Sequence, residues 1–95
     1  MSAYFVVDIE VTDPDRYTEY VKQVPPVVKK YGGRYLVRGG DHEVLEGDWT
    51  PRRLVVLEFP STADARRFYD SADYQPLLEL RKSATRSNVV LVEGA

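Results

Sequence analysis

The fold is decided by a stretch between residues 32 and 49, which reads Gly32-Gly33-Arg34-Tyr35-Leu36-Val37-Arg38-Gly39-Gly40-Asp41-His42-Glu43-Val44-Leu45-Glu46-Gly47-Asp48-Trp49. Glycine adopts the left-handed backbone conformation without steric cost, so the first Gly-Gly pair predicts the end of a helix. Arg34 to Arg38 and Glu43 to Glu46 have the composition of two short strand segments. The second Gly-Gly pair, with Asp41, predicts a tight turn or a bulge between them. The stretch therefore predicts a second, broken strand.

The residues before this stretch predict a strand and then a helix. Tyr4 to Val11 is rich in β-branched and aromatic residues and has apolar side chains at every second position. Asp13 can cap a helix that starts at Pro14. An apolar stripe at helical spacing follows, formed by Tyr17, Tyr20, Val21, Val24, Val27, Val28 and Tyr31. Because proline lacks a backbone donor, Pro25-Pro26 predicts a kink or a restart within this helix.

The residues after the stretch predict another strand, a second helical region and a last strand. Gly47 to Pro51 forms a loop, and the third strand runs from Arg53 to Phe59. Ser61 or Thr62 caps the next helix, and a helical segment restarts at residues 73–76. The last strand runs from Asn88 to Glu93.

This βαββαβ order is typical of a ferredoxin-like α+β fold, an antiparallel four-stranded sheet with both helices on one face, in a single domain of residues 1–95. The strands carry apolar residues at both parities, for example Tyr4 and Val6 as well as Phe5 and Val7. Helices can cover only one face of the sheet. We therefore expect a symmetric homodimer that covers the other face.

Composition excludes several classes of protein. The formal charge of −2 and the pI near 5.3 argue against a nucleic-acid partner, which needs a concentrated field of Lys and Arg. The third strand also lacks the basic residue, glycine and exposed aromatics of an RNA-recognition domain. The absence of cysteine excludes disulfides and thiolate sites. No apolar segment is long enough to span a bilayer, so we expect no membrane partner and a cytoplasmic location.

The chain resembles the DUF 1330 family, a domain of unknown function in the dimeric α+β barrel superfamily, over nearly its whole length. The motifs that carry the resemblance are residues 13–17, 31–40, 45–49, 58–61 and 74–77 with Arg81. The resemblance implies a homodimeric barrel. The relatives of such barrels include small monooxygenases acting on polyketide aromatics, muconolactone-type isomerases and haem-binding chlorite dismutases. It implies no catalytic residues, because the family has no assigned reaction.

His42 is the only histidine, and Glu46 lies four residues further along. A base with an orienting carboxylate is one interpretation of this pair. An exposed turn residue is the more common role of a histidine beside Gly-Gly-Asp. The chain has no His pair at ligand spacing, so we expect neither a metal nor a cofactor.

Four charged residues raise a question of sheet faces. Arg34 and Arg38 share a parity with Leu36. Asp8 shares one with Tyr4 and Val6 on its own strand, and Glu58 shares one with Leu54 and Val56. If these parities coincide on one face, the four groups form either an ion-pair network or a polar pocket. In a pocket, the arginines could hold a carboxylate or an enolate-like oxygen, and a displaced carboxylate could act as a base.

Three further residues are candidates for a ligand site. Trp49 lies in a loop and could form a wall over a flat ligand, or anchor that loop at the dimer edge. Tyr74 and Arg81 are seven residues apart, two turns along one helix face, and could point into the same cleft. The candidate ligand-binding residues are therefore Arg34, Arg38, His42, Trp49, Glu58, Tyr74 and Arg81.

Two functions remain open from the sequence. One is a homodimeric barrel that binds a small aromatic or carboxylate-bearing molecule, with cofactor-independent oxygenase or isomerase activity. The other is a non-enzymatic dimeric binding or interaction module whose charged residues are structural. A solvent-connected cavity reached by Arg38, Glu58 or Trp49 would favour the first, and mutual pairing of those groups in a filled core would favour the second.

Overall fold

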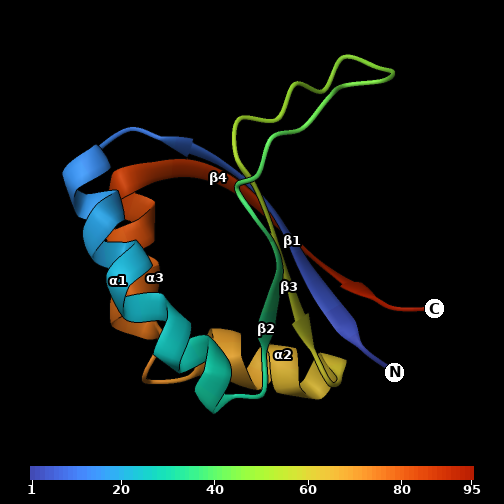
Figure 1. Ribbon diagram of the computed structural model, residues 1–95. Helices are drawn as coiled ribbons and strands as arrows, with labels where there is room; N and C mark the ends of the chain where they lie inside the picture. Colours follow the sequence, from blue (N-terminus) through green and yellow to red (C-terminus); the bar gives the residue numbers. More distant parts are fainter.

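A computed structural model describes all 95 residues as one four-stranded sheet with three helices. The elements are β1 (Ala3–Val11), α1 (Pro14–Lys30), β2 (Arg34–Arg38), β3 (Leu54–Phe59), α2 (Thr62–Asp70), α3 (Gln75–Ala84) and β4 (Thr85–Glu93). The strand order is β2-β3-β1-β4, and each neighbouring pair is antiparallel. The helices lie on one side of a curved sheet (Figure 1). The ferredoxin-like α+β architecture predicted from the element order is confirmed.

Local sequence signals account for the helix ends. The Asp13 carboxylate accepts a hydrogen bond from the Arg16 amide at 3.2 Å, and Pro14 occupies the first turn of α1. The Ser61 hydroxyl accepts a hydrogen bond from the Asp64 amide at 3.1 Å and caps α2. Gly32 has a φ of 85°, in the left-handed region, and follows the end of α1.

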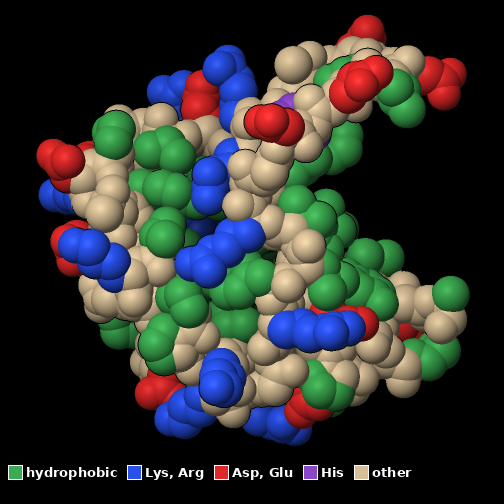
Figure 2. Space-filling view, viewed as in Figure 1, with side chains coloured by type: hydrophobic (Ala, Val, Ile, Leu, Met, Phe, Trp, Pro, Cys, Tyr) green, Lys and Arg blue, Asp and Glu red, His purple; other side chains and the backbone are tan.

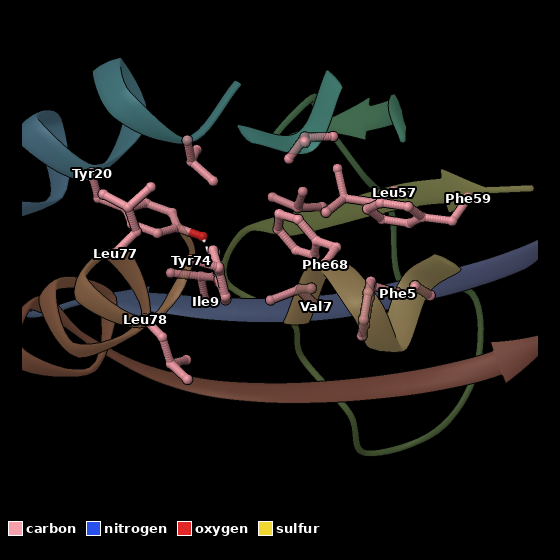
Figure 3. Packing of buried hydrophobic residues seen from close by; sticks show 14 of the residues in the cluster. Phe5, Val7, Ile9, Tyr20, Leu57, Phe59, Phe68, Tyr74, Leu77 and Leu78 are labelled. Atoms are coloured by element: carbon pink, nitrogen blue, oxygen red, sulfur yellow. Dashed lines mark hydrogen bonds between the residues drawn. The ribbon is translucent and has the colours of Figure 1, made fainter. Parts of the chain in front are cut away.

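The core lies between the sheet and the helices (Figure 3). Alternate residues of β1 and β3 are buried there, among them Phe5, Val7 and Phe59. Phe68 from α2 packs on Phe59 with ring centroids 5.1 Å apart and on Tyr74 with centroids 4.5 Å apart. An aromatic core of this kind supplies a large buried area from few residues, which a chain of this size needs.

The prediction of a strand from Glu43 to Glu46 is wrong. These residues belong to a long exposed segment between β2 and β3, which projects from the end of the sheet (Figure 1). The ladder between β2 and β3 ends where the Gly39 amide donates to the Leu54 carbonyl oxygen at the start of β3, so the segment beyond Gly39 extends past its partner strand. The second strand is therefore a single short strand.

Two smaller expectations also differ from the structure. Of the kink or restart predicted at Pro25-Pro26, the restart is wrong, because helix α1 runs through both prolines, and Val24 and Val28 on either side of them are almost completely buried. Packing against the core thus holds the helix together where prolines remove backbone donors. Strand β4 starts at Thr85, not Asn88, because its first residues continue the ladder with the end of β1, where Thr85 pairs with Val11.

The sheet face turned away from the helices is apolar and uncovered. Leu36, Val37, Val90 and Val92 are 46%, 40%, 57% and 45% exposed. In Figure 2 a hydrophobic patch lies on this side of the sheet, below the projecting segment. The two-faced character of the strands, predicted from their parities, is present in the structure.

Candidate functional site

A β-bulge in β2 separates the two arginines that the sequence places on one face. Arg34 lies opposite Glu58, but the register shifts between Tyr35 and Val37, and Arg38 lies opposite Val55. One extra residue in a strand inverts the side-chain alternation beyond it. Arg38 is therefore on the helix side of the sheet, and the prediction from their shared parity that Arg34 and Arg38 lie on the same face is wrong.

Glu58 on the outer face is fully paired. Arg34 Nε donates to its Oε1 at 2.6 Å, and the Tyr4 hydroxyl donates to its Oε2 at 3.0 Å. The bonds from Arg34 and then from Tyr4 lower the pKa of the Glu58 carboxyl. Arg34 and Glu58 thus form the ion pair that was one of the two interpretations of these charges.

Asp8 on the outer face is also paired, with the long segment that follows β2. Trp49 Nε1 donates to Asp8 Oδ2 at 2.9 Å, and the Arg52 amide donates to Oδ1 at 3.0 Å. The Trp49 bond is the main cause that lowers the pKa of Asp8. Trp49 therefore fixes its segment to the sheet, as a loop anchor would. His42 lies in the same segment, where its Nε2 is 2.9 Å from the Pro51 carbonyl oxygen.

A cleft opens on the helix side, between α1, α3 and the sheet, with about 50 Å³ of free space. That is several times the space that one water molecule requires. Fourteen of its 17 lining residues are hydrophobic, and the other three are Arg38, Arg53 and Arg81. Figure 2 shows Lys and Arg side chains over a hydrophobic surface in the hollow between helices and sheet.

The three arginines of the cleft have no carboxylate partner. No Asp or Glu lines the cleft, and none of the three guanidinium groups has a carboxylate oxygen within 4.0 Å. Arg81 is only 5% exposed, and Arg53 Nε is buried without a hydrogen-bond partner. Arginine stays protonated at all ordinary pH values. The cleft therefore carries three positive charges, of which that of Arg81 is buried, that of Arg53 half-buried and that of Arg38 exposed.

Aromatic rings form much of the cleft wall. Arg38 lies over the Tyr35 ring with its guanidinium carbon 4.5 Å from the centroid, and Arg53 lies 5.8 Å from that of Tyr17. The hydroxyls of Tyr20 and Tyr74 are 3.0 Å apart and buried (Figure 3). Burial raises the pKa of Tyr20 and of Tyr35, so both keep their protons at neutral pH.

The structure thus divides the seven candidate residues. Arg38, Tyr74 and Arg81 line the cleft, whereas Arg34, Glu58, Trp49 and His42 lie outside it. Arg53 was missed, although its parity with Val55 and Leu57 on the buried side of β3 was readable in the sequence. Only the pairing of β3 with β2 shows that side chains of this parity, including that of Arg53, line a cleft.

The structure contains neither a metal-binding cluster nor a membrane-spanning helix. No group of three or more His, Cys, Asp or Glu side chains is arranged to hold a metal ion. None of the helices is both long enough and apolar enough to cross a membrane.

The comparisons with known proteins identify the family and the fold. A family model described as "Domain of unknown function (DUF1330)" matches residues 2–95. No curated protein matches the sequence. The solved structures that are similar include a protein of unknown function, RPA0582, from Rhodopseudomonas palustris, with a TM-score of 0.77 and 19% identity, over 99% of this chain and 82% of that one.

Two other similar structures are a dimeric protein and an oxygenase. A dimeric ferredoxin-like protein of unknown function from Jannaschia sp. CCS1 has a TM-score of 0.73 and 16% identity, over 99% of this chain and all of that one. SnoaB, a cofactor-independent oxygenase from Streptomyces nogalater, has a TM-score of 0.68 and 12% identity, over 99% of this chain and 93% of that one. At these identities the likeness establishes the shared fold.

Proposed function

This chain belongs to the DUF1330 family of domains of unknown function, and we propose that it binds a small aromatic anion in the cleft between its helices and its sheet. The observation that carries the proposal is the set of three guanidinium groups, from Arg38, Arg53 and Arg81, that face apolar walls with no carboxylate among them. Arg81 is buried, Arg53 is half-buried and Arg38 is exposed, and burying the charge of Arg81, and in part that of Arg53, without a counter-charge is unfavourable. A bound anion would supply the missing charge, and the aromatic walls suit a flat ligand.

The proposal includes a homodimer formed through the outer sheet face. That face exposes valine and leucine side chains from β2 and β4, which a second copy would cover. The dimeric ferredoxin-like relative from Jannaschia supports this assembly. The ion pair of Arg34 with Glu58 and the bond of Trp49 to Asp8 lie on the same side of the sheet and have a structural role in this view.

Cofactor-independent oxygenation fits the cleft better than isomerisation. An isomerase must move a proton with a positioned base. The cleft offers no His, Asp or Glu, and burial raises the pKa of Tyr20 and Tyr35, so both keep their protons near neutral pH and cannot accept one from a substrate. Guanidinium groups can stabilise the anionic oxygen of a substrate that ionises readily, such as a phenol or an enol. The description of SnoaB as a cofactor-independent oxygenase is compatible with this chemistry.

The alternative is a non-enzymatic dimeric binding or interaction module whose charged residues are structural. The hydrogen bonds that Glu58 and Asp8 accept on the outer face favour a structural role for these two carboxylates. A structural role as ion pairs does not account for Arg38, Arg53 and Arg81 in the cleft, because none of them has a carboxylate partner.

Two arginines of one strand provide a matched test. Isothermal titration calorimetry would measure binding of benzoate and 1-naphthoate to the wild type, to Arg38→Gln and to Arg34→Gln. We expect Arg38→Gln to weaken binding about tenfold, which corresponds to about 1.4 kcal/mol, and Arg34→Gln to bind as the wild type does. Equal loss in both variants, or no binding of either acid to the wild type, would overturn the proposal. Oxygen uptake with a hydroxylated naphthoate would then separate an oxygenase from a binding module.

A further inference from the structure

We infer that the cleft holds its ligand at two separate polar ends, so that the ligand is an aromatic acid with a second oxygen substituent on the ring. A carboxylate would lie against Arg38 and Arg53, and a hydroxyl or carbonyl oxygen would lie against Arg81 and the Tyr20–Tyr74 pair. This inference rests on the proposed function and specifies its ligand class.

The first polar end belongs to the sheet. Arg38 lies opposite Val55, and Arg53 precedes Val55 by two residues, so both side chains are on the helix face as diagonal neighbours. Residues in this relationship are about 7 to 8 Å apart across antiparallel strands. Two long side chains can therefore bring their guanidinium groups to one anion. Without an anion between them, their charges repel each other.

Local structure presents the Arg53 guanidinium to the cleft. Gly39 has a φ of 73°, and a methyl group at this position would overlap the Arg53 guanidinium carbon. Only glycine combines this backbone conformation with so close an approach. Arg53 is thus held between Gly39 and the Tyr17 ring, with its Nε buried and unpaired. An oxygen acceptor in the cleft would satisfy the remaining donors of this group.

The second polar end belongs to the helices. Tyr74 is the N-cap residue of α3, and Arg81 lies two turns further along the helix and is 5% exposed. Burial lowers the pKa of Arg81, but the nearby hydroxyls of Tyr74, Tyr20 and Tyr69 raise it overall. The bond between the Tyr20 and Tyr74 hydroxyls uses one of their two protons. The other proton, together with the Arg81 donors, is available to one oxygen atom of a ligand.

The surface between the two ends is apolar. The rest of the cleft wall, which includes Phe5, Val7, Leu57 and Phe68, is hydrophobic, and no acidic side chain lines it. A ligand that reaches from Arg38 to Arg81 would therefore need a flat hydrophobic body, and a purely aliphatic or highly charged molecule would leave unpaired groups on one side or the other.

The test combines ligand truncation with side-chain truncation. Calorimetry would compare benzoate, phenol and the 2-, 3- and 4-hydroxybenzoates on the wild type, on Arg38→Gln and on Arg81→Met. For the wild type, we expect at least one hydroxybenzoate to bind about tenfold more tightly than benzoate and than phenol. In Arg81→Met, we expect this hydroxybenzoate to bind no more tightly than benzoate. In Arg38→Gln, we expect it to bind no more tightly than phenol.

The outcomes separate this inference from the proposed function. If benzoate binds as tightly as every hydroxybenzoate, the second polar end is wrong while anion binding stands. If none of the acids binds, both proposals are wrong. Because Arg81→Met could disturb the fold, thermal unfolding and a binding measurement with benzoate would accompany it. An Arg81→Met protein that is folded, binds benzoate and still prefers the hydroxybenzoate overturns the assignment of Arg81.

Discussion

Arg34 and Arg38 lie four residues apart on one short strand and face opposite sides of the sheet. The bulge at Leu36 separates them, so that Arg34 pairs with Glu58 while Arg38 lies opposite Val55 and enters the cleft. Bulges often redirect a side chain beside a functional site. A single inserted residue thus gives the two arginines of one strand different roles: Arg34 forms a structural ion pair, and Arg38 faces the candidate ligand site.

Gly39, which follows Arg38, is predicted to be intolerant of a side chain. Gly39→Ala places a non-glycine residue at a φ of 73° and forces Arg53 to move, so we expect a loss of about 1 to 2 kcal/mol in the free energy of unfolding. Gly40→Ala is the matched control, because nothing lies within 4 Å of its added methyl group. Urea unfolding would measure both. Equal effects at the two glycines would contradict the role given to Gly39.

The pair between Glu58 and Arg34 predicts a dependence of stability on pH. The pKa of Glu58 in the folded state is below its ordinary value of 4.5, so its contribution is present in full above that value and is lost as the pH falls below it. We expect Glu58→Gln to have a lower urea midpoint than the wild type at pH 6. The difference should shrink as the pH approaches the folded-state pKa. A difference that does not change with pH would show that the charge of Glu58 has no part in it.

The fold could be predicted from the sequence because each strand and helix has its own local signal, such as the alternation in β1 and the Asp13 cap of α1. The places of Arg38 and Arg53 in the candidate site could not be predicted from the sequence. The parity of Arg38 depends on a bulge that only the register with β3 reveals, and Arg53 is a site residue only because Gly39 and Tyr17 flank it. Tyr74 and Arg81 were predictable, since one helix fixes their relative direction.

Arg81 is predicted to contribute little to stability. It is a buried cation without a carboxylate partner, so Arg81→Met, which keeps much of the volume, should leave the free energy of unfolding unchanged or raise it by about 1 kcal/mol. Urea unfolding of the ligand-free protein would measure this. A loss of more than about 2 kcal/mol would show that Arg81 supports the fold, and its role as an anion partner would lose its main argument.

The hydroxyls of Tyr20 and Tyr74 are predicted to act as a pair. Either Tyr20→Phe or Tyr74→Phe leaves one buried hydroxyl without its partner, which should lower the free energy of unfolding by about 1 kcal/mol. The double variant removes both groups and should be destabilised by less than the sum of the single effects. Urea unfolding of the wild type, the two single variants and the double variant would complete this double-mutant cycle. Additive effects would show that the two hydroxyls do not interact in solution.

The outer sheet face is predicted to be the dimer interface. A stable interface buries about 800 Å² on each partner, and the exposed Val90 and Val92 lie on the uncovered apolar face of the sheet. We expect light scattering to give a dimer mass for the wild type at micromolar concentration and a monomer mass for Val90→Asp, because a carboxylate would be buried without a partner. Gln23→Asp, on the exposed side of α1, is the control and should remain dimeric. A monomeric wild type would remove the reason for placing a second copy on this face, and the apolar residues of β2 and β4 would then need a different partner.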